Sequence, residues 1–368
     1  MKSLRASLAK PTKCYTNTAG LVYTSFMSFR AWLSTITLVL IAVIIFFSRH
    51  ELVRAWLLLE NVNIWILLLM IPGQILVYYA GAEMMFSYLR SKKNIERIPP
   101  LGLARIALEM NFVNHVLPSG GVSGMSYMSW RLGKYGVTPG KATMAQIVRF
   151  AMGFVSFIAL LFVAVIVVTI DGSINRWIIL VSSMLVIGMS GTIVGGIFLV
   201  SSERRMNAFA AWFVRTVNRL VKKITFGRKK SIVKKDKILT FFTEIYEDYR
   251  ALRRDKRVLI VPFLWGLLFN AADVALFVIT FWALGAPINP APILIAYGVA
   301  SVAGFFVVTP GGAGAYEAIM VAFLAVAGIS SGEAIAGIVL ARVIILLGTI
   351  GFGYLFYQHA IVKYGKRA

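Results

Sequence analysis

Of the 368 residues, 59% are hydrophobic and only 14% are charged, which is more apolar surface than a soluble fold of this size can bury. Several apolar runs reach the roughly 18–20 residues that cross a bilayer, so the sequence predicts an all-α polytopic membrane protein. The formal net charge of +23 would suggest nucleic acid in a soluble protein, but here the basic residues lie mostly between apolar runs. They favour loops that face anionic lipid, and we expect no nucleic-acid partner.

About six full transmembrane helices are predicted, and their apolar runs lie at 31–48, 62–88, 142–170, 177–201, 258–284 and 333–358. Two further apolar segments, 101–128 and 291–328, are interrupted by Pro and Gly. Each interrupted segment is interpreted either as a re-entrant hairpin of two half-helices or as two short spans. Both interpretations leave the order of the other spans across the membrane unchanged.

The distribution of Lys and Arg predicts the orientation. The tail at 1–30 is basic, and the segment 203–257 holds 17 Lys and Arg against 6 Asp and Glu. Both belong on the cytoplasmic side, as does the short tail at 359–368. We expect a multi-pass protein of the plasma (inner) membrane with both termini in the cytoplasm.

The basic segment has its own helical pattern. Apolar residues recur there at three- and four-residue spacing: Met206, Phe209, Phe213, Val217, Leu220 and Ile224. Lys and Arg occupy the remaining positions, which predicts an interfacial helix on the cytoplasmic leaflet, followed by a second helix at about 237–254.

The two halves of the chain repeat one order of elements with opposite orientation. Residues 31–170 and 177–358 each run as span, span, interrupted segment, span, which predicts an inverted repeat. The tips of the interrupted segments read VLPSGGVSG at 116–124 and VTPGGAG at 308–314. Broken helices at mid-membrane expose backbone N–H groups that suit a phosphate or carboxylate. Candidate substrate-binding or gating residues at these tips are Pro118, Gly120, Gly121, Pro310, Gly311, Gly312 and Gly314.

Ionisable residues inside spans are functional candidates because the bilayer makes them costly. Here they include Arg131, Arg149, Asp273, Glu317 and Arg342, with Glu109 and His115 as candidates for coupling to protons or ions. A simpler interpretation is that Glu317 and Arg342 form an ion pair that only holds two helices together. Arg131 has an alternative place at the cytoplasmic interface.

The residues PGGAGAYE at 310–317, followed by Arg342, resemble the membrane domain of the lysylphosphatidylglycerol synthase/flippase family. The family pattern Pro-Gly-Gly-x-Gly-x-x-Glu matches Pro310, Gly311, Gly312, Gly314 and Glu317. NFVNHVLPSGG at 111–121, followed by Arg131, extends the resemblance. Family members often carry an Arg and a Glu shortly after this first proline, where this chain has Gly120, Gly121 and Ser123.

The resemblance implies movement of a lipid from the inner to the outer leaflet. The lipid is expected to be anionic or aminoacylated, as in the best-known members. Those members also carry a soluble aminoacyl-transferase domain, whereas this sequence ends at Ala368, ten residues beyond the last predicted span. We therefore expect a flippase or scramblase that works by alternating access and is not an enzyme.

Other functions remain as alternatives: an ion-coupled transporter of a small solute, or an accessory subunit of a separate lipid-modifying transferase. An intramembrane enzyme acting on a lipid phosphate has weak support from His115 near Ser119 and Ser123. A single Cys and three scattered His give no expected metal site, and the absence of a phosphate-binding loop motif gives no expected cofactor. A homo-oligomer is left open.

Overall fold

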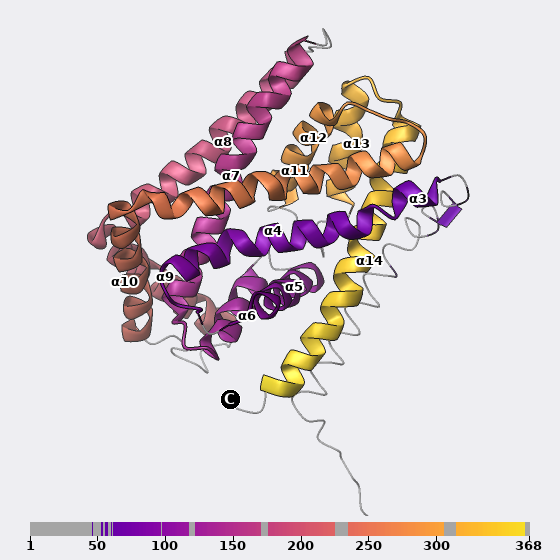
Figure 1. Cartoon of the computed structure of the whole chain (residues 1–368). Coiled ribbons are helices and arrows are strands. Elements are labelled where there is room, and N and C mark those ends of the chain that lie inside the picture. Colours follow the sequence, from indigo (N-terminus) through magenta and orange to yellow (C-terminus); the bar gives the residue numbers. More distant parts are fainter. Residues whose placement is uncertain are drawn as a thin grey trace, which may run out of the picture.

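The computed structural model describes residues 46, 53, 56, 57, 60, 62–96, 98–117, 122–170, 176–224, 235–304 and 314–364. The regular elements in these ranges are helices (Figure 1). In chain order they are α3 (Ile64–Leu67), α4 (Met70–Ser91), α5 (Pro100–Val116), α6 (Val122–Gly133), α7 (Pro139–Ile170), α8 (Arg176–Val200), α9 (Glu203–Ile224), α10 (Lys235–Arg254), the 3₁₀ turn η1 (Lys256–Leu259), α11 (Ile260–Ala283), α12 (Pro290–Gly304), α13 (Ala315–Val326) and α14 (Ser331–Tyr364). The chain is an all-α polytopic membrane protein.

Five of the six expected spans are confirmed as helices that are long and apolar enough to cross a membrane. They cover Ile64–Ser91, Pro139–Ile170, Ile179–Val200, Lys256–Ala283 and Ser331–Tyr364. The expected span at 31–48 lies outside the described residues. At 1.5 Å per residue, the 34 residues of α14 extend about 51 Å, well beyond the roughly 30 Å hydrocarbon layer.

The two interrupted segments form pairs of shorter helices. α5 packs against α6, and α12 packs against α13. Their lengths range from the 12 residues of α13 to the 17 of α5, or about 18–26 Å. The connecting tips lie outside the described residues, and with them Pro118, Gly120, Gly121, Pro310, Gly311 and Gly312. Of the candidate tip residues, Gly314 is described.

α11 and α4 pack along each other and cross the middle of the view in Figure 1. At one end, the N–H of Asn63 donates to the carbonyl of Ala283 at 2.9 Å. At the other end, the Tyr88 hydroxyl donates to Asp248 of α10 at 2.9 Å. The two helices therefore connect the α10 end of the molecule to the opposite end.

A close crossing joins α7 to α11. The Asn270 amide of α11 donates to the Gly153 carbonyl at 3.1 Å and to the Ser156 hydroxyl at 2.9 Å, both on α7. Gly266 permits this approach, because a Cβ there would lie 2.6 Å from the Ser156 oxygen. A polar side chain inside an apolar span is thus satisfied by the neighbouring helix.

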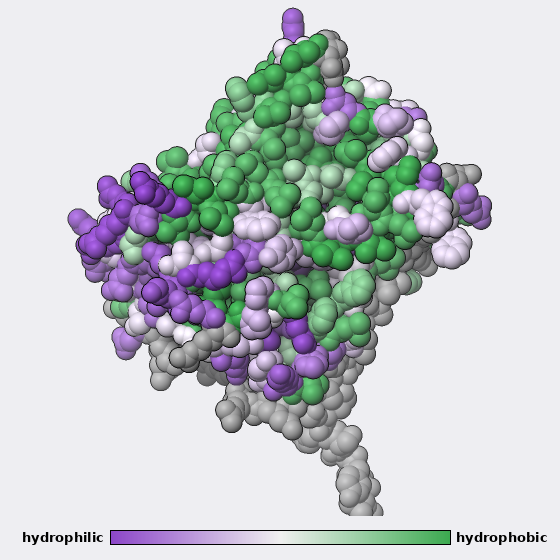
Figure 2. Space-filling model, viewed as in Figure 1, coloured by the Kyte–Doolittle hydropathy of each residue, from purple (hydrophilic) through white to green (hydrophobic). Residues whose placement is uncertain are grey.

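The basic segment forms the two helices that the sequence predicts, α9 and α10. Part of the apolar face of α9 is used inside the protein: Met206 is buried, and the rings of Phe209 and Phe213 contact Phe242 of α10. α10 covers Met206 and contacts Phe209, whereas Phe213 remains 37% exposed. Figure 2 shows hydrophilic residues gathered around this end and a hydrophobic surface over α7, α8 and α11.

Candidate functional site

A polar cavity of about 230 Å³ lies where both halves of the chain meet. Four residues singled out in the sequence line it together: His115 of α5, Arg149 of α7, Asp273 of α11 and Arg342 of α14. The further polar residues around it are Tyr78, Asn111, Tyr297, Tyr316 and Thr349. These five were not singled out in the sequence, because uncharged polar side chains are common within helices and carry no signal of their own.

Arg342 and Glu317 form a buried ion pair on one side of the cavity. The Arg342 Nε donates to Glu317 Oε1 at 2.7 Å, and the guanidinium lies over the Tyr316 ring, 4.3 Å from its centroid. The other carboxylate oxygen of Glu317 accepts the Gly314 N–H at 2.7 Å, at the start of α13. Gly314 has φ +86°, a backbone conformation that favours glycine. Glu317 therefore holds both Arg342 and the first turn of α13.

Arg149 faces the cavity without such a partner. Among the described residues no carboxylate lies within ion-pair distance of its guanidinium, and its Nη1 is 3.9 Å from the Met110 sulfur. Gly81 of α4 lies beside it: a Cβ there would be in ordinary contact with Arg149 Nη2, at 3.6 Å, and in tighter contact with the Phe269 ring, at 3.1 Å. A cation held this way within an apolar span can accept an anionic ligand.

Asp273 is the carboxylate that lines the cavity. The Tyr297 hydroxyl of α12 donates to its Oδ2 at 2.6 Å. His115 is held by its own helix, with Nδ1 lying 2.8 Å from the Asn111 carbonyl oxygen. Its other ring nitrogen is therefore the one available to the cavity or to a proton.

Glu109 and Arg131 form a second cluster that does not line the cavity. Glu109, which is fully buried, accepts from Arg131 Nε at 3.1 Å, from Arg105 Nε at 3.1 Å and from the Tyr127 hydroxyl at 2.9 Å. Arg131 also lies over the ring of Tyr364, 4.0 Å from its centroid, at the end of α14. Of the candidate residues, Glu109 and Arg131 therefore lie outside the cavity that Arg149, Asp273 and Arg342 line.

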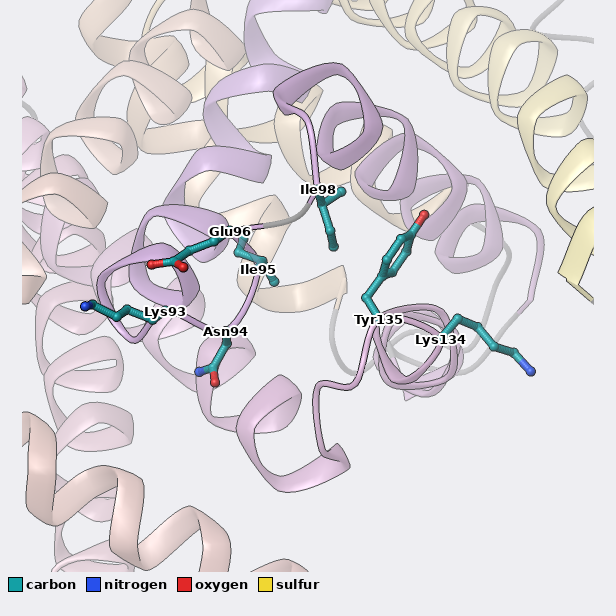
Figure 3. Close-up of a pocket in the computed structure, with 7 residues that line it drawn as sticks. All are labelled: Lys93, Asn94, Ile95, Glu96, Ile98, Lys134 and Tyr135. Atoms are coloured by element: carbon teal, nitrogen blue, oxygen red, sulfur yellow. The ribbon is translucent and has the colours of Figure 1, made fainter.

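A wider hollow of about 580 Å³ opens beside this cluster, between the α4–α5 connection and the end of α6 (Figure 3). Ile98 and Tyr135 point toward each other across it. The ammonium groups of Lys93 and Lys134 point outward on opposite sides. Its lining residues belong to the segments before α5 and after α6, so the two outer ends of the α5–α6 pair meet on one side of the molecule.

A family model described as the lysylphosphatidylglycerol synthase TM region matches residues 18–353. Two relatives, each described as a UPF0104 membrane protein, come from Methanothermobacter thermautotrophicus. One is 24% identical over 236 residues, which cover 63% of this chain and 67% of the relative. The other is 26% identical over 132 residues, so the match spans about a third of each chain, 36% in both cases.

Proposed function

This chain belongs to the family of the lysylphosphatidylglycerol synthase transmembrane region, and we propose that it moves phospholipids between the leaflets of a plasma membrane. The observation that carries the proposal is the guanidinium of Arg149, which faces a polar cavity at the centre of the bundle with no carboxylate partner among the described residues. An uncompensated charge in such a place costs several kcal/mol, and a lipid phosphate would offset that cost.

The two short helix pairs are proposed as re-entrant hairpins that enter from opposite sides. Each helix is shorter than the roughly 30 Å hydrocarbon layer, and the hollow in Figure 3 brings the outer ends of α5 and α6 to one side. The basic helices α9 and α10 favour a cytoplasmic location for that side. The opening of the α12–α13 pair then lies on the outer side.

The inverted repeat predicted from the sequence would explain why two arginines line one cavity. α7 follows the first hairpin and α14 follows the second. Arg149 lies ten residues after Pro139, and Arg342 lies eleven residues after Ser331, so the two sit at similar depths in corresponding helices. Arg342 of α14 is paired with Glu317 of α13, the helix that precedes α14. The corresponding helix before α7 is α6, and it contains no acidic residue that could pair with Arg149. Arg149 is therefore the arginine left for an anionic headgroup.

In the proposed cycle a headgroup enters from one hairpin, binds Arg149 near Arg342 and leaves past the other hairpin. No covalent step is needed, so the protein is proposed as a transporter and not as an enzyme. Asp273, His115 and the Glu109 cluster are the groups through which protons or ions would couple to this movement. The partners are membrane lipids, of which anionic or aminoacylated phospholipids match the positive charge of Arg149.

The test is lipid exchange by the purified protein in liposomes that contain headgroup-labelled phosphatidylglycerol, measured as the fraction that dithionite quenches over time. We expect faster exchange than in empty liposomes, and its loss in Arg149→Gln. Arg257→Gln, which changes an exposed arginine on η1, is the matched control and should exchange lipid normally.

Absence of exchange with anionic, zwitterionic and aminoacylated lipids alike would contradict the proposal. In that case ion-dependent uptake of a small anion into the same vesicles would favour a solute transporter. If the protein shows neither lipid exchange nor anion uptake and a transferase co-purifies with it, an accessory subunit would be favoured.

A further inference from the structure

A second hollow, of about 560 Å³, lies on the bilayer-facing side of α4, α5 and α14. We call it the lateral groove, and its apolar lining is formed chiefly by Ile71, Ile75, Leu108, Leu347, Phe352 and Phe356. Ile75 and Phe352 are each more than 60% exposed, although both belong to predicted spans. A concave apolar surface at this depth meets hydrocarbon chains and not water.

The lateral groove and the polar cavity share one wall. Tyr78 lines both, Gln74 lines the groove, and Thr349 lines the cavity. The two hollows therefore lie side by side, one apolar and open to the bilayer, the other polar and containing Arg149. A phospholipid has the same two parts in the same relation, acyl chains joined to an anionic headgroup.

Three polar side chains close the boundary between them. The Gln74 amide of α4 donates to the Tyr78 hydroxyl at 2.5 Å and to the Ile345 carbonyl of α14 at 2.8 Å. The Tyr78 hydroxyl forms a hydrogen bond with the Thr349 hydroxyl, which in turn donates to the Ile345 carbonyl at 2.7 Å. This bridge connects α4 to α14 by side-chain hydrogen bonds, which rotamer changes can break and remake without moving either helix.

Gly348 of α14 allows the bridge to form. A Cβ at this position would lie 2.8 Å from the Gln74 amide nitrogen, so any larger residue would push that amide aside. Gln74 is buried and Tyr78 is half-buried within the α4 span, where polar groups cost several kcal/mol unless they are satisfied. Because they pair with each other and with α14, they close the wall between the lateral groove and the polar cavity at this point.

We propose that the lateral groove holds the acyl chains of a phospholipid and that the Gln74–Tyr78–Thr349 bridge is the lateral gate through which its headgroup enters the cavity. The inference rests on the proposed lipid transport, and it adds the route of entry and the part of the lipid that each hollow binds. A small soluble anion has no acyl chains that could occupy the groove.

The first test is photo-crosslinking in proteoliposomes with a phosphatidylglycerol that carries a diazirine on an acyl chain, mapped by mass spectrometry. We expect labels on the segments around Ile75 and Leu347, and we expect excess unlabelled phosphatidylglycerol to compete them away. Ile187 of α8 is a matched control, because it is also highly exposed and faces the bilayer elsewhere. Labelling of the groove that does not compete, or that does not exceed the control, would overturn the inference, including the case in which another segment of the chain covers the groove.

The second test fills the groove. Gly348→Leu should slow lipid exchange by about tenfold or more. Gly195→Leu of α8, where nothing lies within 4 Å of an added Cβ, should leave exchange within about twofold of the wild type. Tyr78→Phe breaks the bridge without adding volume, and we expect it to change the exchange rate while the groove labelling persists. Normal exchange in both Gly348→Leu and Tyr78→Phe would overturn the gate.

The two proposals fail in different ways. Competable labelling of the groove in a protein that exchanges no lipid would overturn lipid transport and leave a lipid-binding groove. Lipid exchange that needs Arg149, together with unlabelled groove residues, would overturn the lateral gate and leave the transport proposal standing.

Discussion

Arg342 of α14 donates a hydrogen bond from its Nε to Glu317 Oε1 of α13, the preceding helix, at 2.7 Å. The same carboxylate accepts the N–H of Gly314. Glu317 thus serves as the partner of a buried cation and as the cap of α13. Its removal affects the ion pair and the start of the half-helix together.

Glu317→Gln is expected to lower the stability of the protein. The substitution removes the carboxylate that accepts the hydrogen bond from Arg342 Nε and so breaks a buried ion pair, which costs about 3–5 kcal/mol. Thermal unfolding in detergent measures the effect, with Glu333→Gln as the control because Glu333 is exposed in the first turn of α14. Combining Glu317→Gln with Arg342→Gln should restore part of the loss, since the unpaired charge is then gone. Additive losses in the double variant would show that the pair is not coupled.

Arg149→Met is expected to stabilise the lipid-free protein while it abolishes exchange. Removing a cation that has no carboxylate partner among the described residues relieves a desolvation cost, and we expect a gain of about 1 kcal/mol or more. The measurement is unfolding temperature with and without added phosphatidylglycerol. By binding to the folded state, the lipid should raise the unfolding temperature of the wild type, and it should raise the unfolding temperature of Arg149→Met much less. Equal stabilisation of both proteins by the lipid would remove Arg149 from the site.

Glu109→Gln is expected to separate stability from binding. The Glu109 cluster holds two arginines but does not line the cavity. The variant should therefore lose about 3 kcal/mol or more of the free energy of unfolding, which is measured as a lower unfolding temperature. Competition by phosphatidylglycerol in the crosslinking assay should stay within about twofold of the wild type. A loss of competition larger than that of Arg149→Gln would place Glu109 in direct contact with the headgroup.

Gly266→Ala tests the close crossing of α7 and α11. The added methyl would lie 2.6 Å from the Ser156 oxygen and 3.1 Å from the Met152 carbonyl oxygen, and the second atom belongs to the backbone and cannot move aside. We expect a loss of about 1–3 kcal/mol in the free energy of unfolding. Gly191→Ala in α8 is the control, because nothing lies within 4 Å of its added Cβ.

The sequence predicts the spans well because twenty apolar residues in a row have few other uses. It also singles out Arg149, Asp273 and Arg342, since charge inside a span is costly. It does not reveal that Arg149 and Arg342 share a cavity, because the two residues lie 193 positions apart in the sequence and only packing brings them together. Nor does it separate Glu109 from that cavity. The direction of a side chain on α5 depends on how α6 folds back, which the tip residues do not specify.

α14 contacts both halves of the molecule through charged groups. Arg342 binds the start of the α13 half-helix, and about six turns later the ring of Tyr364 carries the guanidinium of Arg131 from α6. Both contacts belong to one unbroken helix of 34 residues. A displacement of α13 that keeps its ion pair would therefore be passed along α14 to the contact with α6 near the other end of that helix. In the transport cycle proposed above, α14 would join the two helix pairs to one rigid element, so that the two pairs would move together and not independently.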